Sequence, residues 1–486
     1  MSVEPASEEP PMSAQTESQP KSASAATYRD PKRYAYLLVP FWVLSPLLSI
    51  YLAISTGHAA WYWLVIVLTY LVFPVLDFDA LIGRDTRNPP ESLVPRLEED
   101  RWYRVITYVA VPCHYVTLFV GAWTVATQEL SVLSYIAVAW SCGLMNGFAV
   151  ATAHELGHKK GGLERWLSKI CLATGCYGQY MIDHNRGHHR DVATPEDSGS
   201  ARFGENFWGY MFRRQLPHST LFRPWQLEKE RLARKGMGPW TLQNEFIQPM
   251  LISAVTYGVI VALWGWPVVP YLIAVAFIAY LFLALADYIE HYGLLREKLP
   301  DGRYARVRPE HSWNTDHVAS NVIFWNVQRH SDHHAWPTRR YQSLRSFEQV
   351  PNMPTGYPGM FGIALIPPLW RAIMYPRVLA FHGHDLTRMN VDPARREALM
   401  RRYHQPSAAP VVNAADGAAS RRQGHVIAAR AGAAPRHQCP GCGYVYDEAR
   451  GDPQQGFAPG TPWQAIPAAW QCPDCAVRDK VDFLRL

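Results

Sequence analysis

Six long apolar runs alternate with charged connections along this chain. They cover residues 35–55, 59–76, 105–127, 130–153, 249–266 and 268–285. A helix needs about 20 predominantly apolar residues to cross a bilayer, and buried helices of soluble proteins do not reach that length so often in one chain. The pattern therefore predicts six transmembrane helices, arranged as three hairpins with tight outer turns.

The basic residues orient these predicted helices. The short turns at 56–58, 128–129 and 265–266 contain no Lys or Arg. Positive charge accumulates on the cytoplasmic side of membrane proteins, so both termini and the longer connections are expected in the cytosol. The basic residues of those connections include Arg84, Arg87, Arg96, Arg101 and Arg104 before helix three, and Lys159, Lys160 and Arg165 after helix four.

Whole-chain averages hide this division. The 486 residues are 48% hydrophobic with a formal charge of +6, and the mean hydropathy is −0.14. The apolar content excludes a wholly disordered chain, and the small net charge disfavours a nucleic-acid binder. The unusual counts are 19 His and 8 Cys, and both residue types are clustered.

Composition divides the chain into four parts. Residues 1–30 lack the pattern of a secretory signal and are expected to be a disordered tail. The membrane domain covers 31–403, and the Ala-, Gly- and Pro-rich residues 404–436 are expected to be a flexible linker. Residues 437–486 are dense in Cys, Trp and Gly, as in a small domain that a metal stabilises.

Four segments on the predicted cytosolic side contain nine of the 19 histidines. Residues three or four positions apart lie on one face of a helix, so a segment can direct two imidazoles to one point. His189 and His334 follow such pairs, about 100° further round the helix, and are expected to serve a second metal. Nine imidazoles are too many for one ion and suit two. The nine are His154, His158, His184, His188, His189, His291, His330, His333 and His334.

Ligand type alone leaves the metal open, because imidazole binds zinc, copper, iron and nickel. His154, Glu155 and His158 also match the H-E-x-x-H motif of zinc metalloproteases, in which the Glu is the general base. An intramembrane zinc protease is therefore one interpretation, although it uses only two of the nine histidines. An iron pair uses all nine and requires an electron source.

The C-terminal residues provide a candidate electron source. Two C-x-x-C pairs, Cys439 with Cys442 and Cys472 with Cys475, offer four thiolates for zinc or iron. Spacing alone does not separate a zinc ribbon from an iron site. The residues between the pairs resemble rubredoxin, which implies one Fe(Cys)4 centre that transfers single electrons. The matching residues are Tyr444, Tyr446, Gly451, Asp452, Gly456, Pro459, Gly460, Thr461, Ile466, Pro467, Trp470, Lys480 and Phe483.

Residues from about 34 to 403 resemble the integral-membrane alkane 1-monooxygenases (AlkB type), a group of histidine-rich membrane di-iron enzymes. The matching stretches are H-E-L-G-H-K-K from His154, H-N-R-G-H-H-R-D from His184, Y-I-E-H-Y-G-L from Tyr288 and Q-R-H-S-D-H-H from Gln328. The resemblance implies that all nine histidines bind two non-haem irons. Two features depart from the family: Asp287 replaces a common Asn, and rubredoxin is usually a separate protein.

The implied fold is a mainly α six-helix bundle with a cytosolic di-iron cap and a small rubredoxin domain. The implied reaction converts the terminal methyl group of medium-to-long-chain alkanes to a 1-alkanol with O2, using electrons from the fused rubredoxin. An FAD-dependent NAD(P)H rubredoxin reductase would load that domain, since no Gly-rich dinucleotide motif follows a strand here. The implied location is the bacterial inner membrane, with both termini and the metal sites in the cytosol, and no nucleic acid is expected as a partner.

Neutral imidazoles leave a metal pair strongly positive, so nearby carboxylates are expected to orient the ligand rings. The candidates are Glu155, Asp183, Asp191, Asp197, Glu290 and Asp332.

Besides the zinc protease, two other functions fit parts of the pattern. A membrane fatty-acyl desaturase or hydroxylase uses the same chemistry, but such enzymes usually pair with a cytochrome b5-type donor. A non-catalytic electron-transfer or metal-storage protein would not need so many histidines. The sequence leaves open the alkane length, the oligomeric state, the assignment of each histidine to an iron, any bridging ligand, and the roles of His311 and His317.

Overall fold

A computed structural model describes most of the chain. The described residues are 28–159, 161–300, 302, 304–405, 435–439, 444–452, 455, 457–467, 470, 472–473 and 478–486. The predicted tail up to residue 27, the linker residues 406–434, and both Cys442 and Cys475 lie outside this set.

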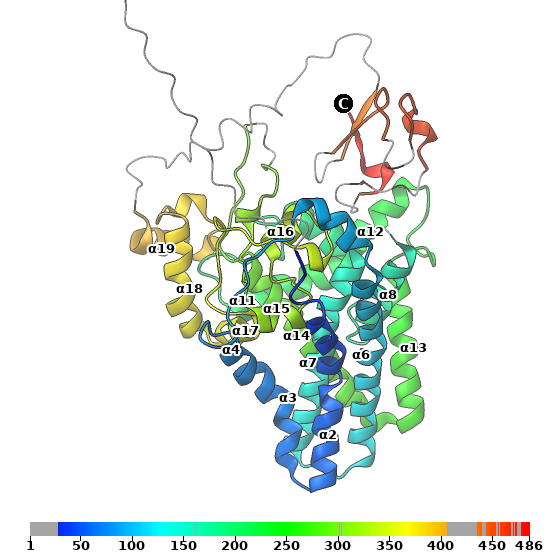
Figure 1. The fold of residues 1–486 in the computed structure, drawn as a ribbon, viewed down its shortest axis with the longest axis vertical. Coiled ribbons are helices and arrows are strands. Elements are labelled where there is room, and N and C mark those ends of the chain that lie inside the picture. The colour runs from blue at the N-terminus through cyan, green and yellow to red at the C-terminus, as the bar shows by residue number, and fades with distance from the viewer. Residues whose placement is uncertain are drawn as a thin grey trace, which may run out of the picture.

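Long apolar helices form one bundle (Figure 1). Among the described residues, five segments are long and apolar enough to cross a membrane. A sixth forms if α1 (Leu38–Val43) and α2 (Ser45–Thr56), which are bent by 53° relative to each other, act as one crossing. This count agrees with the six predicted helices. The five segments are Ala59–Leu76, Arg101–Thr127, Val132–Gly157, Ile247–Trp264 and Trp266–Glu290.

The bend in the first span has a local cause. Pro46 occupies the first turn of α2, where the N–H that proline lacks would not be bonded within the helix anyway. Pro46 cannot donate to the carbonyl of Trp42 four residues earlier, and its ring crowds that carbonyl, so α1 ends and a new helix begins.

Helix α7 (Val132–Gly157) lies at the centre of the bundle, and 89% of the residues in its apolar membrane-spanning stretch are buried. It packs against α6 (Arg101–Thr127), α8 (Gly162–Ala173) and α14 (Val269–Glu290). Cβ atoms at Gly143 and Gly147 would lie only 2.7 Å from the side chains of Ile278 and Phe282 on α14. These two glycines let the helices approach closely. The C-terminal ends of α7 and α14 are therefore held side by side.

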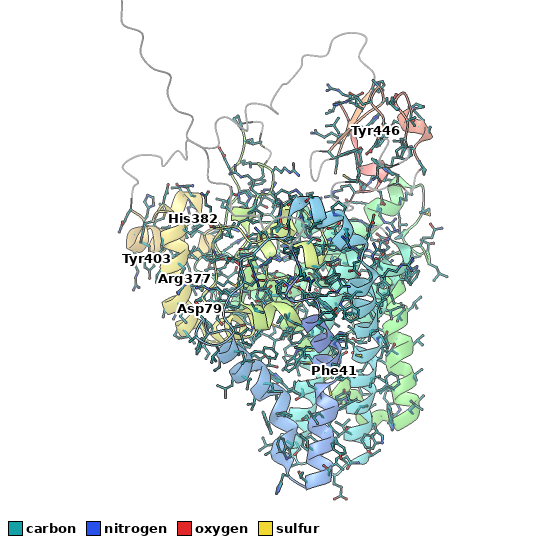
Figure 2. All side chains as sticks on the ribbon, viewed as in Figure 1. Phe41, Asp79, Arg377, His382, Tyr403 and Tyr446 are labelled. Carbon is teal, nitrogen blue, oxygen red and sulfur yellow. The ribbon has the colours of Figure 1, made fainter. Side chains whose placement is uncertain are left out.

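Large apolar side chains cover the outside of the bundle. Tyr51 on α2, and Val255 and Leu263 on α13 (Ile247–Trp264), are more than half exposed. Figure 2 shows Phe41 on the flank of the bundle, and this side chain is 71% exposed. An apolar surface of this extent is typical of contact with lipid. The chain is therefore described as a multi-pass membrane protein.

Short helices form a cap over the end of the bundle where α7 and α14 terminate (Figure 1). Figure 2 labels His382 and Tyr403 in the lobe that α18 and α19 form beside this cap. Helices α3 (Leu64–Val67) and α4 (Phe73–Leu76) belong to the span Ala59–Leu76. The remaining shorter helices are α5 (Val94–Glu99), α9 (Tyr180–Asp183), α10 (His189–Asp191), α11 (Phe207–Tyr210), α12 (Arg223–Arg234), α15 (Val318–Ile323), α16 (His330–Ala335), α17 (Tyr357–Leu365), α18 (Pro367–Phe381) and α19 (Arg396–Tyr403).

The C-terminal residues fold as a small separate unit. Strands β1 (Arg436–Gln438), β2 (Val445–Asp447) and β3 (Leu484–Arg485) form an antiparallel sheet in the order β2-β1-β3. Tyr446, labelled in Figure 2, is fully buried against Trp463 and Trp470. This aromatic core is small for a free-standing domain, which agrees with the need for a metal to stabilise it.

Candidate metal centre

The nine clustered histidines come together where the cap meets the bundle. His154 lies in the last turn of α7 and His291 follows the last residue of α14. A π-helical turn (His184–His188) leads into α10, and α16 lies beside them in the cap. Segments separated by up to 180 residues thus direct their imidazoles into one region.

The imidazoles form two groups, and within each group the nitrogens offered to a metal lie within 4.8 Å of one another. The Nε2 atom of His184 is 3.1 Å from Nε2 of both His158 and His189. In the other group, the Nε2 atoms of His291 and His330 are 3.2 Å apart. Group one contains His154, His158, His184, His189 and His333, and group two contains His188, His291, His330 and His334.

These distances fit two bound metal ions. Ligands about 2.1 Å from a shared metal stand roughly 3.0–3.4 Å from each other, which is the observed spacing. Nε2 of His154, Nε2 of His188 and both ring nitrogens of His334 are buried and have no hydrogen-bond partner among the residues that the structure describes. Buried polar atoms are normally bonded, so these nitrogens have the arrangement expected of metal ligands.

The grouping differs from the sequence-based expectation in two segments. His189, expected at the second metal, belongs to the first group, whereas His188 and His330, expected at the first metal, belong to the second group with His334. The physical reason is the π-helical turn, in which residues five apart are hydrogen-bonded. His184 and His189 therefore share a face that an α-helix would give to His184 and His188. In α16, His330 and His334 share group two, whereas His333 faces group one.

Two of the six candidate carboxylates contact a ligand ring. Asp197 Oδ2 accepts a hydrogen bond from Nδ1 of His188 at 2.8 Å, and Glu290 Oε2 lies 3.3 Å from Nε2 of His330. The other four pair with a basic side chain instead. These pairs are Glu155 with Lys159, Asp183 and Asp191 with Arg223, and Asp332 with Arg345.

The electrostatics of Asp197 and Asp183 differ. Burial favours the neutral form of Asp197, but His188 and Arg223 outweigh it and hold the pKa of this carboxyl well below its usual range. Burial raises the pKa of Asp183 to about 6, with Arg223 opposing the shift. Asp197 is therefore a stable anionic acceptor for a ligand ring, and Asp183 is not.

Sequence reasoning missed Tyr180 and Arg223 near the ligand rings and left the role of His311 open. The Tyr180 hydroxyl is 2.8 Å from Nδ1 of His184, and the backbone carbonyl of His311 is 2.9 Å from Nδ1 of His291. Arg223 holds the carboxylates behind the π-helical turn. Only Tyr180 gave a signal in the sequence, because it stands four residues before His184. The ring of His317 turns elsewhere and contacts Thr315.

A pocket lies between the metal centre and the apolar interior of the bundle. His154 of group one and His330 of group two both line it, together with Glu290. Its other walls are mainly apolar, with Phe282 and Phe324 among them. The free volume is about 30 Å³, so side chains have to move apart before a hydrocarbon chain can enter.

In the C-terminal domain, Cys439 and Cys472 are fully buried. Their backbone N–H groups donate to the carbonyls of Tyr444 and Arg478, each at 2.8 Å. The two cysteines pack together beside Tyr444 and Phe483. Two buried thiols at one place, one from each C-x-x-C pair, fit a tetrathiolate iron site.

The C-terminal domain lies next to α12 of the cap (Figure 1), and opposite charges join the two. Arg234 and Lys235 at the end of α12 pair with Asp482 and Asp479, at 2.7 and 3.0 Å. Arg478 donates to the backbone carbonyl of Arg186 at 3.1 Å. The domain therefore touches the segment that carries His184 and His188.

A buried ion network supports this contact from the cap side. The Arg186 guanidinium is 2.7 Å from Glu228 and 2.6 Å from Glu245. Burial would raise the pKa of Glu245, but Arg186 and Lys169 outweigh it and hold that pKa well below its usual range. The network fixes the peptide whose carbonyl receives Arg478.

Fold and site together define a multi-pass membrane protein with a histidine-rich two-metal centre and a fused cysteine-ligated domain. Family models agree with this class: "Fatty acid desaturase" matches residues 130–364 and "Rubredoxin" matches 436–483. Full-length relatives are more specific. The chain is 47% identical to the alkane 1-monooxygenase of Ectopseudomonas oleovorans over 79% of this chain and 95% of the relative.

Two further relatives extend the comparison. Alkane 1-monooxygenase 1 of Alcanivorax borkumensis is 46% identical over 79% of this chain and 94% of its own length. Rubredoxin-1 of Pseudomonas putida is 65% identical over 49 residues, which are 10% of this chain and 28% of that protein. The chain therefore belongs to the alkane 1-monooxygenase family and carries a C-terminal rubredoxin domain.

Proposed function

We propose that this protein hydroxylates the terminal methyl group of medium-to-long-chain alkanes with O2 at a di-iron centre. The nine imidazoles of the two groups would hold the irons. When bound, such an iron pair supplies the reductive activation of O2, a reaction that amino-acid side chains do not perform. The observation that carries the proposal is the apolar pocket, because one histidine from each group lines it.

The side chains around the centre have separate roles in this proposal. Asp197, Tyr180 and the His311 carbonyl bind the outer ring nitrogens and so fix which nitrogen faces each metal. The apolar walls recognise a substrate that has no polar group, and they exclude water from the reacting methyl group. A chain entering from the bundle side would present its end to both groups of imidazoles.

Electron delivery is proposed to occur within the chain. Cys439, Cys442, Cys472 and Cys475 would hold the rubredoxin iron, although Cys442 and Cys475 lie outside the described residues. The N–H of Cys472 bonds to the carbonyl of Arg478, and the Arg478 side chain bonds to the backbone carbonyl of Arg186, midway in the chain between His184 and His188. This contact supports direct transfer from the rubredoxin domain to the metal centre. A separate FAD-dependent NAD(P)H reductase is proposed to load the domain.

The orientation in the membrane is also a proposal. The cap and the rubredoxin domain are assigned to the cytosol of a bacterial inner membrane, because the basic connections lie there. The test places one single cysteine in the cap and another in the 128–131 turn, and labels each from either side of sealed inverted vesicles. The two cysteines should be labelled from opposite sides, and labelling of both from the same side would contradict the assignment.

The central experiment uses the full chain, loaded anaerobically with Fe(II) and supplied with a reductase and NADH. The expected product is the 1-alkanol, measured over alkanes of graded length by gas chromatography. Bound iron should approach two per membrane domain and one per rubredoxin. No alkanol from protein with full iron content would contradict the proposal. Desaturated fatty-acyl products instead would favour the chemistry named by the broader family model.

Two pocket variants link this activity to the described site. Ala286→Leu narrows the pocket and should abolish turnover of the longest alkanes, whereas Leu283→Ala widens it and should extend the accepted length. Iron content should be unchanged in both. Val259→Leu, on the exposed side of α13, is the matched control. A control that changes the product range as much as the pocket variants would contradict this placement of the substrate.

A further inference from the structure

The two groups of histidines are unequal. Group one offers five imidazoles and group two offers four. Glu290 Oε2 lies 3.3 Å from Nε2 of His330, and that nitrogen is 3.2 Å from Nε2 of His291 in the same group. The carboxylate oxygen thus stands at the spacing that separates two ligands of one metal.

Glu290 also differs in its partners from four other carboxylates around the centre. Glu155, Asp183, Asp197 and Asp332 each have a Lys or Arg nitrogen within 4 Å. In the described part of the chain, Glu290 contacts the Tyr357 hydroxyl and the His330 ring, with no Lys or Arg beside it. A buried carboxylate is costly unless a cation pairs with it or it binds a metal.

The hydrogen bonds leave one oxygen of Glu290 free for a metal. Tyr357 donates to Oε1 at 2.8 Å, so Oε2 is the oxygen that faces group two. If Nε2 of His330 binds a metal, its lone pair is directed to that metal and it has no proton to donate to Oε2. The negative charge of Oε2, 3.3 Å away, is then offset only if the same metal also attracts it.

We propose that Glu290 is a direct ligand of the second metal, which would then be held by four imidazoles and one carboxylate. The ligand sets of the two metals would differ in charge: the ligands of group one are all neutral, whereas group two includes one anionic ligand. Glu290 lines the substrate pocket, so the anionic ligand lies on the side from which the alkane approaches. This inference rests on the proposed di-metal function and specifies one of its sites.

The test is metal binding to the full chain rather than turnover. Wild type, Glu290→Gln and Tyr357→Phe are titrated anaerobically with Fe(II), and separately with Co(II) for its visible spectrum. We expect Glu290→Gln to weaken one membrane-domain site by roughly 100-fold or more, beyond the 10–100-fold loss typical of a second-layer hydrogen bond. The Co(II) spectrum of that site should also change. Tyr357→Phe keeps the carboxylate and should retain both metals.

Each outcome decides between the interpretations. Wild-type affinity and an unchanged Co(II) spectrum in Glu290→Gln would overturn the inference, as would equal losses in the two variants. Circular dichroism and size-exclusion profiles separate metal loss from misfolding, and Glu290→Asp restores the carboxylate if the glutamine variant is unstable. Wild-type protein that binds metal only in its rubredoxin domain would instead refute the proposed function.

Discussion

The contact between Asp197 and His188 shows how a single residue can tune the centre. Asp197 is fully buried, and besides His188 it binds the hydroxyl of Ser200 and the backbone N–H of Gly199. These bonds fix the carboxylate in place before a metal arrives. The ring of His188 is therefore held with Nε2 directed toward group two.

We predict that Asp197→Asn lowers metal affinity without unfolding the protein. The neutral amide of Asn is a weaker acceptor for the His188 N–H than the carboxylate, so the ring is held less firmly. The affinity of the centre for metal should therefore fall by about 10–100-fold. Asp191→Asn is the matched control, because this substitution removes a similar charge nearby. The Asp191 carboxylate contacts Arg190 and Arg223 rather than a ligand ring. Competition with a chelator measures both. Equal affinities in the two variants would contradict the role of Asp197.

At this scale the sequence identifies candidates but cannot rank them. All six carboxylates stand close to a histidine in the chain, yet four of them pair with Lys or Arg rather than with a ligand ring. Arg223 and Arg345 are 40 and 13 residues from Asp183 and Asp332, and their proximity depends on how the cap folds. Local spacing contains no information about these competitors.

At the scale of elements, the apolar runs determine the helices because length alone distinguishes a membrane span. The pairing of the histidines was less predictable. A π-helical turn replaces α-helix at His184–His188, and this changes which residues share a face. The H-N-R-G-H-H stretch does not by itself specify that geometry, and the turn packs against α12, which is distant in the sequence. The nine residues were identified from spacing, but the partner of His189 was not.

The segment before the first helix allows a test by pH. Lys32 is almost fully buried, donates to Asn326 at 3.2 Å and lies 3.8 Å from Asp85. Burial, assisted by Arg329, lowers the pKa of Lys32 to about 7, against the attraction of Asp85. The unfolded chain has an ordinary lysine pKa of about 10.4. Between these values the unfolded state binds more protons, so stability rises with pH.

We predict that the thermal midpoint of the wild type in detergent rises between pH 7 and pH 9 relative to Lys32→Met. The methionine fills similar space but has no proton to lose, so it removes this pH dependence. The difference should be of the order of 2 kcal/mol, or a few degrees. Curves that stay parallel across this range would show that Lys32 does not titrate with folding.

At the scale of the whole molecule, the fusion combines two elements that sequence identifies separately. The rubredoxin match was readable because aromatic and glycine positions accompany the four cysteines. The place where the domain contacts the cap was not, because Arg234 and Asp482 are 248 residues apart and neither belongs to a motif. Charge complementarity at α12 emerges only when both parts are folded.

The covalent tether and the charges at α12 contribute differently to electron delivery from the rubredoxin domain. A flexible linker of the length predicted from the sequence, about 30 residues, would give an effective rubredoxin concentration on the order of mM. Exposed ion pairs contribute only about 0.2–1 kcal/mol each. In the fused chain, the double change Arg234→Glu and Lys235→Glu should therefore slow turnover less than about threefold.

Cutting the chain near residue 414 removes the concentration effect and leaves the charges to decide. With the two parts mixed at low micromolar concentration, the same double change should lower turnover by roughly tenfold or more, and most strongly at low salt. Asp482→Arg in the rubredoxin part should restore part of the loss, because it re-forms a pair of opposite charges with α12. Arg401→Glu, on exposed α19, is the control for a charge change elsewhere on the cap. Equal losses in the fused and cut proteins would mean that the α12 contact acts on the metal centre itself rather than on docking.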